Sequence, residues 1–186
     1  MLYHVSPTPG LTVLTPRISS HGAAYVYAID CLATALLFGA KKDDFDFLLD
    51  VNEAGVPELW ECYPHAFETI YRGKACTVYE VEATGFQQGL TGWEPEWVST
   101  EEVPVQRAYP VENLYEALFD EVEKSRLILH QYERTPDYRR LIANHVIDRV
   151  IRLDWIERMD TDSRFQTHFS ELRQSLKHLL TGNWLP

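Results

Sequence analysis

The sequence predicts an α+β fold in which a strand-rich N-terminal part precedes a helical C-terminal part. In the first two thirds, short runs of β-forming residues are separated by loops with Pro and Gly, and residues 75–82 show the clearest period-two alternation. Beyond Pro110, apolar residues recur at helical spacing instead. This change of pattern predicts an α+β core over residues 1–112 and a C-terminal helical extension over residues 113–186 that packs on the core.

Local composition predicts the individual elements. The expected strands are rich in β-branched and aromatic residues and cover residues 3–5, 24–28, 45–51, 59–63, 75–82, 96–99 and 103–105. A helix is expected over residues 31–38, with Asp30 as its N-cap and Gly39 at its end. Further helical segments are expected over residues 64–71, 111–132, 138–155 and 164–180.

The charge balance limits the classes of partner. The chain has 186 residues, enough to bury a sizeable core, and a formal net charge of −11. Proteins that coat nucleic acid need Lys and Arg to neutralise phosphates, so this balance argues against that class. The acidic run of Asp43, Asp44 and Asp46 is interpreted as a solvated face or loop.

The cysteines and the N-terminus favour an ordinary cytoplasmic protein. Cys31, Cys62 and Cys76 show no paired spacing, so neither a disulfide framework nor a metal site is expected. The N-terminus carries no secretory signal. No apolar stretch reaches the roughly 20 residues that span a bilayer, so no membrane segment is expected.

Four short motifs occur in order along the first 112 residues. They are Tyr3-His4-Val5-Ser6, Val26-Tyr27-Ala28, Val78-Tyr79-Glu80-Val81-Glu82-Ala83-Thr84-Gly85 and Trp97-Val98-Ser99-Thr100-Glu101-Glu102-Val103-Pro104. Together they resemble the signature elements of the ADP-ribosyltransferase superfamily, in particular the small rifampin ADP-ribosyltransferases and the tRNA 2′-phosphotransferases. The resemblance implies a split antiparallel β-sheet core and NAD as a substrate.

The resemblance also implies three catalytic residues. His4 would hydrogen-bond the ribose hydroxyls, and the ring of Tyr27 would stack on the nicotinamide. Glu101 would hydrogen-bond the ribose 2′-hydroxyl and stabilise the cationic, oxocarbenium-like ribose that forms as the nicotinamide leaves. Glu102 is the alternative to Glu101, because the match does not distinguish between neighbours.

Four further residues are expected to bind the dinucleotide. Val5 lies in the backbone segment that would grip the nicotinamide amide, although the family usually has Gly there. Ser6 would bond the same amide or cap a turn, and Arg17 would pair with the pyrophosphate or remain an exposed arginine. Tyr25 shares its side of the strand with Tyr27, so the two are either site residues or cross-strand aromatics.

The resulting hypothesis is an enzyme that transfers ADP-ribose from NAD to an acceptor, or that hydrolyses NAD. The acceptor is open between a protein, a nucleic acid and a small molecule. The alternative is a catalytically inactive binding module with the same fold, which Val5 favours. A tRNA 2′-phosphotransferase is less favoured, because Tyr27 stands where that family has a second His. Trp155 and Trp184 offer a surface for a homodimer.

Overall fold

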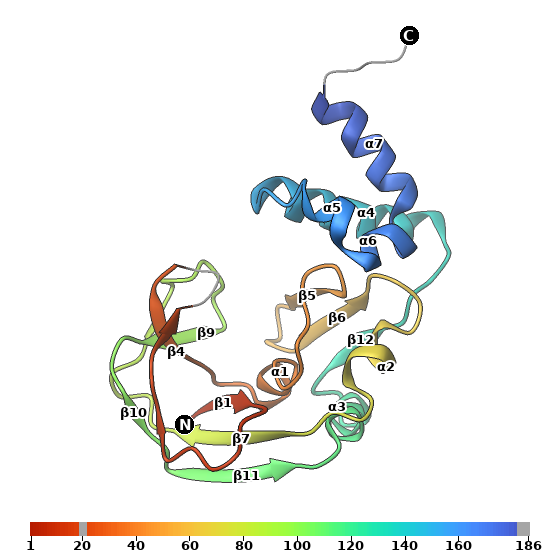
Figure 1. Cartoon of the computed structure of the whole chain (residues 1–186). Helices are drawn as coiled ribbons and strands as arrows, with labels where there is room; N and C mark the ends of the chain where they lie inside the picture. The colour runs from red at the N-terminus through yellow and green to blue at the C-terminus, as the bar shows by residue number, and fades with distance from the viewer. Residues whose placement is uncertain (19–21, 182–186) are drawn as a thin grey trace. The chain divides into compact units, whose positions relative to one another are not determined.

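The computed structural model describes residues 1–18 and 22–181, with side chains up to residue 177 (Figure 1). Contacts divide the chain into two compact units: residues 1–42, 51–57 and 67–128 form the first, and residues 43–50, 58–66 and 129 onward form the second. This grouping differs from the expected boundary at residue 112. The expected division into a core over residues 1–112 and a helical extension over residues 113–186 that packs on it stays a prediction.

The first unit is built on an antiparallel sheet. The sheet has seven strands, in the order β11-β7-β1-β4-β9-β8, with β3 paired to β4 beside this path. Its strands are β1 (Leu2–Ser6), β3 (Arg17–Ile18), β4 (Ala24–Ile29), β7 (Cys76–Val81), β8 (Gln87–Gln88), β9 (Glu96–Ser99) and β11 (Arg107–Val111). The strands β2 (Val13–Leu14) and β10 (Val103–Pro104) pair separately. The expected strands at residues 3–5, 24–28, 75–82 and 96–99 are therefore confirmed.

The sheet opens between β1 and β4. On its other side, β1 pairs with β7 along its whole length, from Leu2 opposite Val81 to Ser6 opposite Thr77. Toward β4, it has the single pair Tyr3–Ile29. Beyond that pair the two strands diverge, while β4 stays paired with β9 (Figure 1). The backbone therefore leaves a gap in the middle of the sheet.

The helix after β4 corrects two expectations. Helix α1 spans Leu32–Leu36, and its N-cap is Cys31 without a side-chain hydrogen bond, so Asp30 does not cap it. The helix ends at Leu36 with Leu37 as its C-cap, so Gly39 does not terminate it; the missing side chain of Gly39 matters for packing. A Cβ there would lie 2.9 Å from both Cys76 Sγ and Leu114 Cδ2, so only glycine fits without a shift.

The expected helix over residues 111–132 is wrong at both ends. Val111 belongs to β11, an edge strand, which is why it tolerates Pro110. Helix α3 spans Leu114–Glu123, with the Asn113 side chain accepting from the Glu116 N–H at 3.3 Å. Ser125 then adopts a left-handed φ of 57°, which ends the helix. The segment that follows is the strand β12 (Ile128–His130).

The second unit contains most of a three-stranded sheet and the C-terminal helices. The sheet has the order β12-β6-β5, with β5 over Phe47–Val51 and β6 over Pro57–Glu61. Helix α2 (Ala66–Tyr71) follows β6 and belongs to the first unit apart from Ala66. The helices are α4 (Pro136–Arg152), α5 (Arg158–Thr161), α6 (Ser163–His168) and α7 (Ser170–Thr181). The expected helix over residues 164–180 is thus broken at Phe169. Among the described residues, no helix combines the length and apolar character needed to cross a bilayer.

The core of the second unit corrects the interpretation of the acidic run. Asp46 is completely buried, and it accepts hydrogen bonds from the Tyr63 hydroxyl at 2.8 Å and from Arg164 at 2.8 Å. Beside it, the buried ring of Phe45 packs edge-on against Trp155 and Phe165. Asp46 is therefore part of a buried ion-pair network.

The homodimer surface suggested from Trp155 and Trp184 stays a prediction, because Trp184 lies outside the described residues.

Candidate functional site

A cavity of about 270 Å³ lies in the first unit where the sheet opens. Six of the seven predicted site residues line it, namely His4, Val5, Ser6, Arg17, Tyr25 and Tyr27. The other lining residues come from β3, from β4 and from the segment between β1 and β3; they are Thr8, Leu11, Val13, Leu14, Thr15, Ile18 and Val26. The fold therefore brings together residues that are up to 23 positions apart in the sequence, as between His4 and Tyr27.

His4 bridges the opening. Its Nδ1 lies 2.8 Å from the backbone carbonyl of Tyr27, at a point where β1 and β4 no longer pair. Because a carbonyl only accepts, Nδ1 carries the proton, and the neutral ring keeps a lone pair on Nε2. Burial lowers the pKa of His4 and nearby Arg17 lowers it further, against the opposing effect of the Tyr27 hydrogen bond. At neutral pH the imidazole is a neutral hydrogen-bond acceptor.

The lowered pKa predicts a pH dependence of stability. The unfolded chain binds a proton at His4 more readily than the folded protein, so stability falls as the pH drops below about 6.5 toward the lower folded pKa. Urea denaturation of wild type and of His4→Gln, followed from about pH 7 to about pH 5, measures this. The variant should lose less stability on acidification. Equal losses in both proteins would contradict the placement of a neutral, half-buried imidazole.

Tyr27 and His4 approach the cavity from different faces of the sheet. Tyr3 lies opposite Ile29, so alternation along the strands sends His4 and Tyr27 to opposite faces. Both line one cavity because the strands have separated there. The Tyr25 and Tyr27 rings meet edge-on along one strand, with centroids 5.8 Å apart. Their partners on the neighbouring strands are Arg17 and Val98, so this contact is not a cross-strand aromatic pair.

Arg17 is the only lining residue with a formal charge, counted over the residues that the structure describes. It is exposed, lies opposite Tyr25 in the β3–β4 pair, and makes no ion pair with another described residue. In a chain with a net charge of −11, this position gives the cavity a local positive charge. The cavity therefore suits a neutral or anionic ligand.

Ser6 and Val5 have regular structural surroundings. The Ser6 Oγ accepts the Thr8 N–H at 3.1 Å, so Ser6 caps this turn. Val5 pairs with Val78 in the β1–β7 ladder and has no left-handed φ. The backbone at this position does not need glycine for its conformation, and only a ligand approaching the backbone closely would conflict with the valine side chain.

Tyr79 is a site-shaping residue that the sequence analysis missed. Its buried hydroxyl donates to the Thr8 carbonyl at 2.5 Å and accepts the Leu11 N–H at 3.3 Å, and its ring lies 6.2 Å from that of His4. These bonds hold the segment that forms one wall of the cavity. Its role could have been suspected from the sequence. Tyr79 lies in the segment with the clearest strand pattern, and a buried tyrosine there needs a partner for its hydroxyl.

Glu101 is not brought to the cavity. It is exposed in the bend after β9, where the Ser99 Oγ accepts its N–H at 3.1 Å and donates to its carbonyl at 3.2 Å. Neither Glu101 nor the exposed Glu102 lines the cavity. Of the three expected catalytic residues, Glu101 is therefore the one that does not line the cavity.

Comparisons with protein-family models, with curated proteins and with solved structures each find no match to this chain. The function is therefore inferred from the geometry of the site.

Proposed function

We propose that the first unit binds NAD at the opening of its sheet and transfers ADP-ribose from it to an acceptor or to water. In this reaction the bond between the ribose C1′ and the nicotinamide nitrogen breaks, and the nicotinamide leaves with the electron pair. The acceptor attacks C1′ and loses its proton. The sheet that opens after one residue pair is proposed to be the split sheet of an ADP-ribosyltransferase-like fold.

The observation that carries the proposal is the shared cavity of His4, Tyr27 and Arg17. The Nε2 lone pair of a neutral His4 can accept from a ribose hydroxyl, because Nδ1 is already engaged. Tyr27 offers an aromatic face for the nicotinamide ring. At about 270 Å³, the cavity is small beside the roughly 300–1,000 Å³ of typical ligand pockets. The cavity would hold the nicotinamide riboside part of NAD. The pyrophosphate would then lie near the exposed Arg17.

A second candidate function is favoured by the position of Glu101. With this carboxylate outside the cavity lining, the unit would bind the dinucleotide without cleaving it. Val5, whose side chain narrows the approach to the β1 backbone, favours the same alternative. The two candidates share the binding site and differ only in turnover.

Calorimetric titration with NAD and measurement of nicotinamide release test both candidates on the full chain. We expect NAD to bind, and Arg17→Ala to weaken binding about tenfold because a charge-assisted contact to the pyrophosphate is lost. The matched control is Arg107→Ala, an exposed arginine of the same unit that lies outside the cavity and pairs loosely with Glu80 at 3.9 Å. It should bind NAD like wild type.

The outcomes separate the candidates. Binding with nicotinamide release supports the enzyme, and binding without release supports the inactive module. Absence of NAD binding at millimolar concentration, or equal affinities in Arg17→Ala and wild type, would overturn the proposed site.

A further inference from the structure

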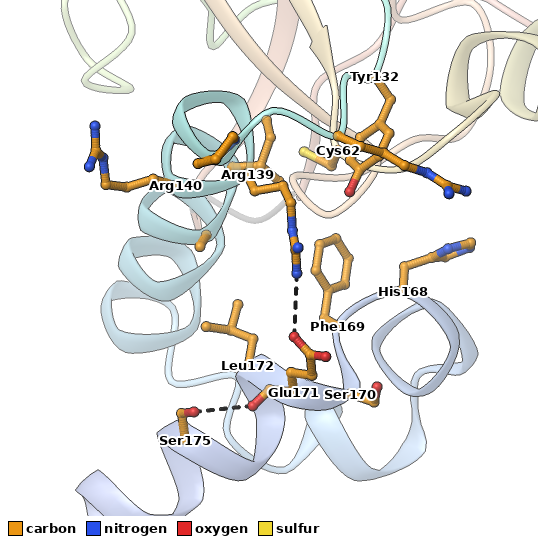
Figure 2. Close-up of a pocket in the computed structure, with 14 residues that line it drawn as sticks. Cys62, Tyr132, Arg139, Arg140, His168, Phe169, Ser170, Glu171, Leu172 and Ser175 are labelled. Atoms are coloured by element: carbon orange, nitrogen blue, oxygen red, sulfur yellow. Dashed lines mark hydrogen bonds and ion pairs between the residues drawn. The ribbon is translucent and has the colours of Figure 1, made fainter.

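A second cavity, of about 620 Å³, lies within the second unit (Figure 2). It is formed by Cys62 at the end of β6, the segment over residues 132–136, the start of α4, and the junction of α6 with α7. Its volume falls within the roughly 300–1,000 Å³ of small-molecule sites. None of its lining residues is among the site residues predicted from the sequence.

The cavity carries an excess of positive charge. Arg134, Arg139 and Arg140 line it, against the single carboxylate of Glu171. This balance is unusual in a chain with a net charge of −11, where acidic residues outnumber basic ones. Guanidinium groups bind phosphate and carboxylate groups through paired N–H donors, so the lining favours an anionic ligand.

The arginines are available for such a ligand. Arg139 reaches from α4 to Glu171 at 3.3 Å, as Figure 2 shows, but the two side chains are 57% and 88% exposed. Arg140 pairs with Asp137 in a similarly exposed ion pair, and Arg134 pairs with no other described residue. Exposed pairs contribute little to stability. A ligand phosphate can therefore replace these carboxylates at small cost.

The start of α7 adds donors on the same side. Ser170 and Glu171, in its first turn, line the cavity, and the preceding residue is Phe169, whose side chain has no acceptor to cap the helix. The Arg173 N–H donates to the Phe169 carbonyl. The N–H groups of residues 170–172 precede it in the first turn, and no described partner accepts from them. These groups form the positive end of the helix dipole and complement the arginines.

Aromatic rings line part of the cavity. Phe169 is buried, Tyr132 is half-buried, and the His168 ring stacks on Tyr63 with centroids 4.2 Å apart. Figure 2 shows Phe169 beside the Arg139–Glu171 pair. A planar ring can pack against these side chains while its anionic group reaches the arginines. Burial and neighbouring carboxylates raise the pKa of the Cys62 thiol, so this residue contributes an apolar surface and no thiolate.

We propose that this cavity binds a mononucleotide-sized ligand, with its phosphate on Arg134 and Arg139 and its planar base against Phe169 and Tyr132. The site is separate from the one proposed for NAD, since none of its lining residues belongs to the first unit. Nothing in the lining supplies an activated nucleophile, so the proposal is for binding.

Calorimetry on the full chain tests it, with the four ribonucleoside monophosphates as probes and adenosine as the phosphate-free comparison. We expect at least one monophosphate to bind, and adenosine to bind about tenfold or more weakly than adenosine monophosphate. Arg134→Ala and Arg139→Ala should each weaken binding about tenfold. Added salt should weaken it as well. These arginines are exposed, so the variants are expected to fold, and thermal denaturation checks this.

Two controls make the result specific. Arg152→Ala removes an equally exposed arginine from the same helix, paired with Asp148 at 3.4 Å and outside the cavity, and should bind like wild type. Arg17→Ala, in the first unit, should also bind monophosphates normally, so failure of the NAD proposal and failure of this one are distinguishable. No binding of any monophosphate at millimolar concentration, equal affinity for adenosine, or unchanged affinity in Arg134→Ala and Arg139→Ala would overturn it.

Discussion

Replacing Arg164 by Ala is expected to destabilise the protein by about 3–5 kcal/mol, because it leaves a buried charge without its partner. The Arg164 guanidinium contacts Asp46 at 2.8 Å, Asp43 at 2.6 Å and Asp162 at 2.7 Å. Asp46 is completely buried and, among the described residues, would keep the Tyr63 hydroxyl and the Asp43 N–H as its donors. Arg164 also holds the pKa of Asp162 at about 2, chiefly through its hydrogen bonds.

Equilibrium urea denaturation measures this loss. The matched control is Arg152→Ala, whose exposed pair with Asp148 should contribute roughly 0–1 kcal/mol. Adding Asp46→Asn to Arg164→Ala removes the unpaired charge and should recover part of the stability. An Arg164→Ala variant no less stable than Arg152→Ala would show that the network does not hold the second unit together.

For the proposed transferase, replacing Glu101 by Gln is expected to lower the rate of nicotinamide release by about 100-fold or more. This effect requires the bend after β9 to bring the carboxylate to the ribose when NAD binds, because Glu101 lies outside the cavity lining. The amide keeps the shape of the side chain and removes the negative charge that would stabilise the cationic ribose. NAD affinity should stay close to that of wild type, because the charge acts on the cationic ribose that forms only as the nicotinamide leaves. Rates and affinities are measured on the same preparations, which separates turnover from binding.

Glu102→Gln is the matched control, since it makes the same change at the next exposed residue. A loss confined to Glu101→Gln assigns the carboxylate to Glu101, and a loss confined to Glu102→Gln assigns it to Glu102. Release that is unaffected in both variants would contradict a role for either glutamate in the reaction.

Local patterns were reliable where a segment's own residues decide its structure. The period-two run became β7, and the helix predicted from residue 138 occurs as α4, extended at its start by the Thr135 cap and Pro136. The expected helix over residues 111–132 failed because buried Leu127 continues the apolar spacing after the chain has left the helix at Ser125. The spacing of apolar residues reflects which residues are buried, so a buried leucine in a loop can continue the helical spacing where there is no helix.

The sequence by itself determined the strands β1, β4, β5, β6, β7, β9 and β10, most of the helices, and the motif residues that come to line one cavity, His4 and Tyr27 among them. It did not predict β3, β8, β11 or β12. Only the tertiary structure decided that β1 and β4 separate after one pair, that the His4 imidazole spans the gap, and that the acidic run pairs with an arginine 118 residues away. The physical reason is that local propensity depends on neighbours in the chain. Strand separation, the protonated nitrogen of a histidine and the burial of a carboxylate depend on partners that only folding brings close.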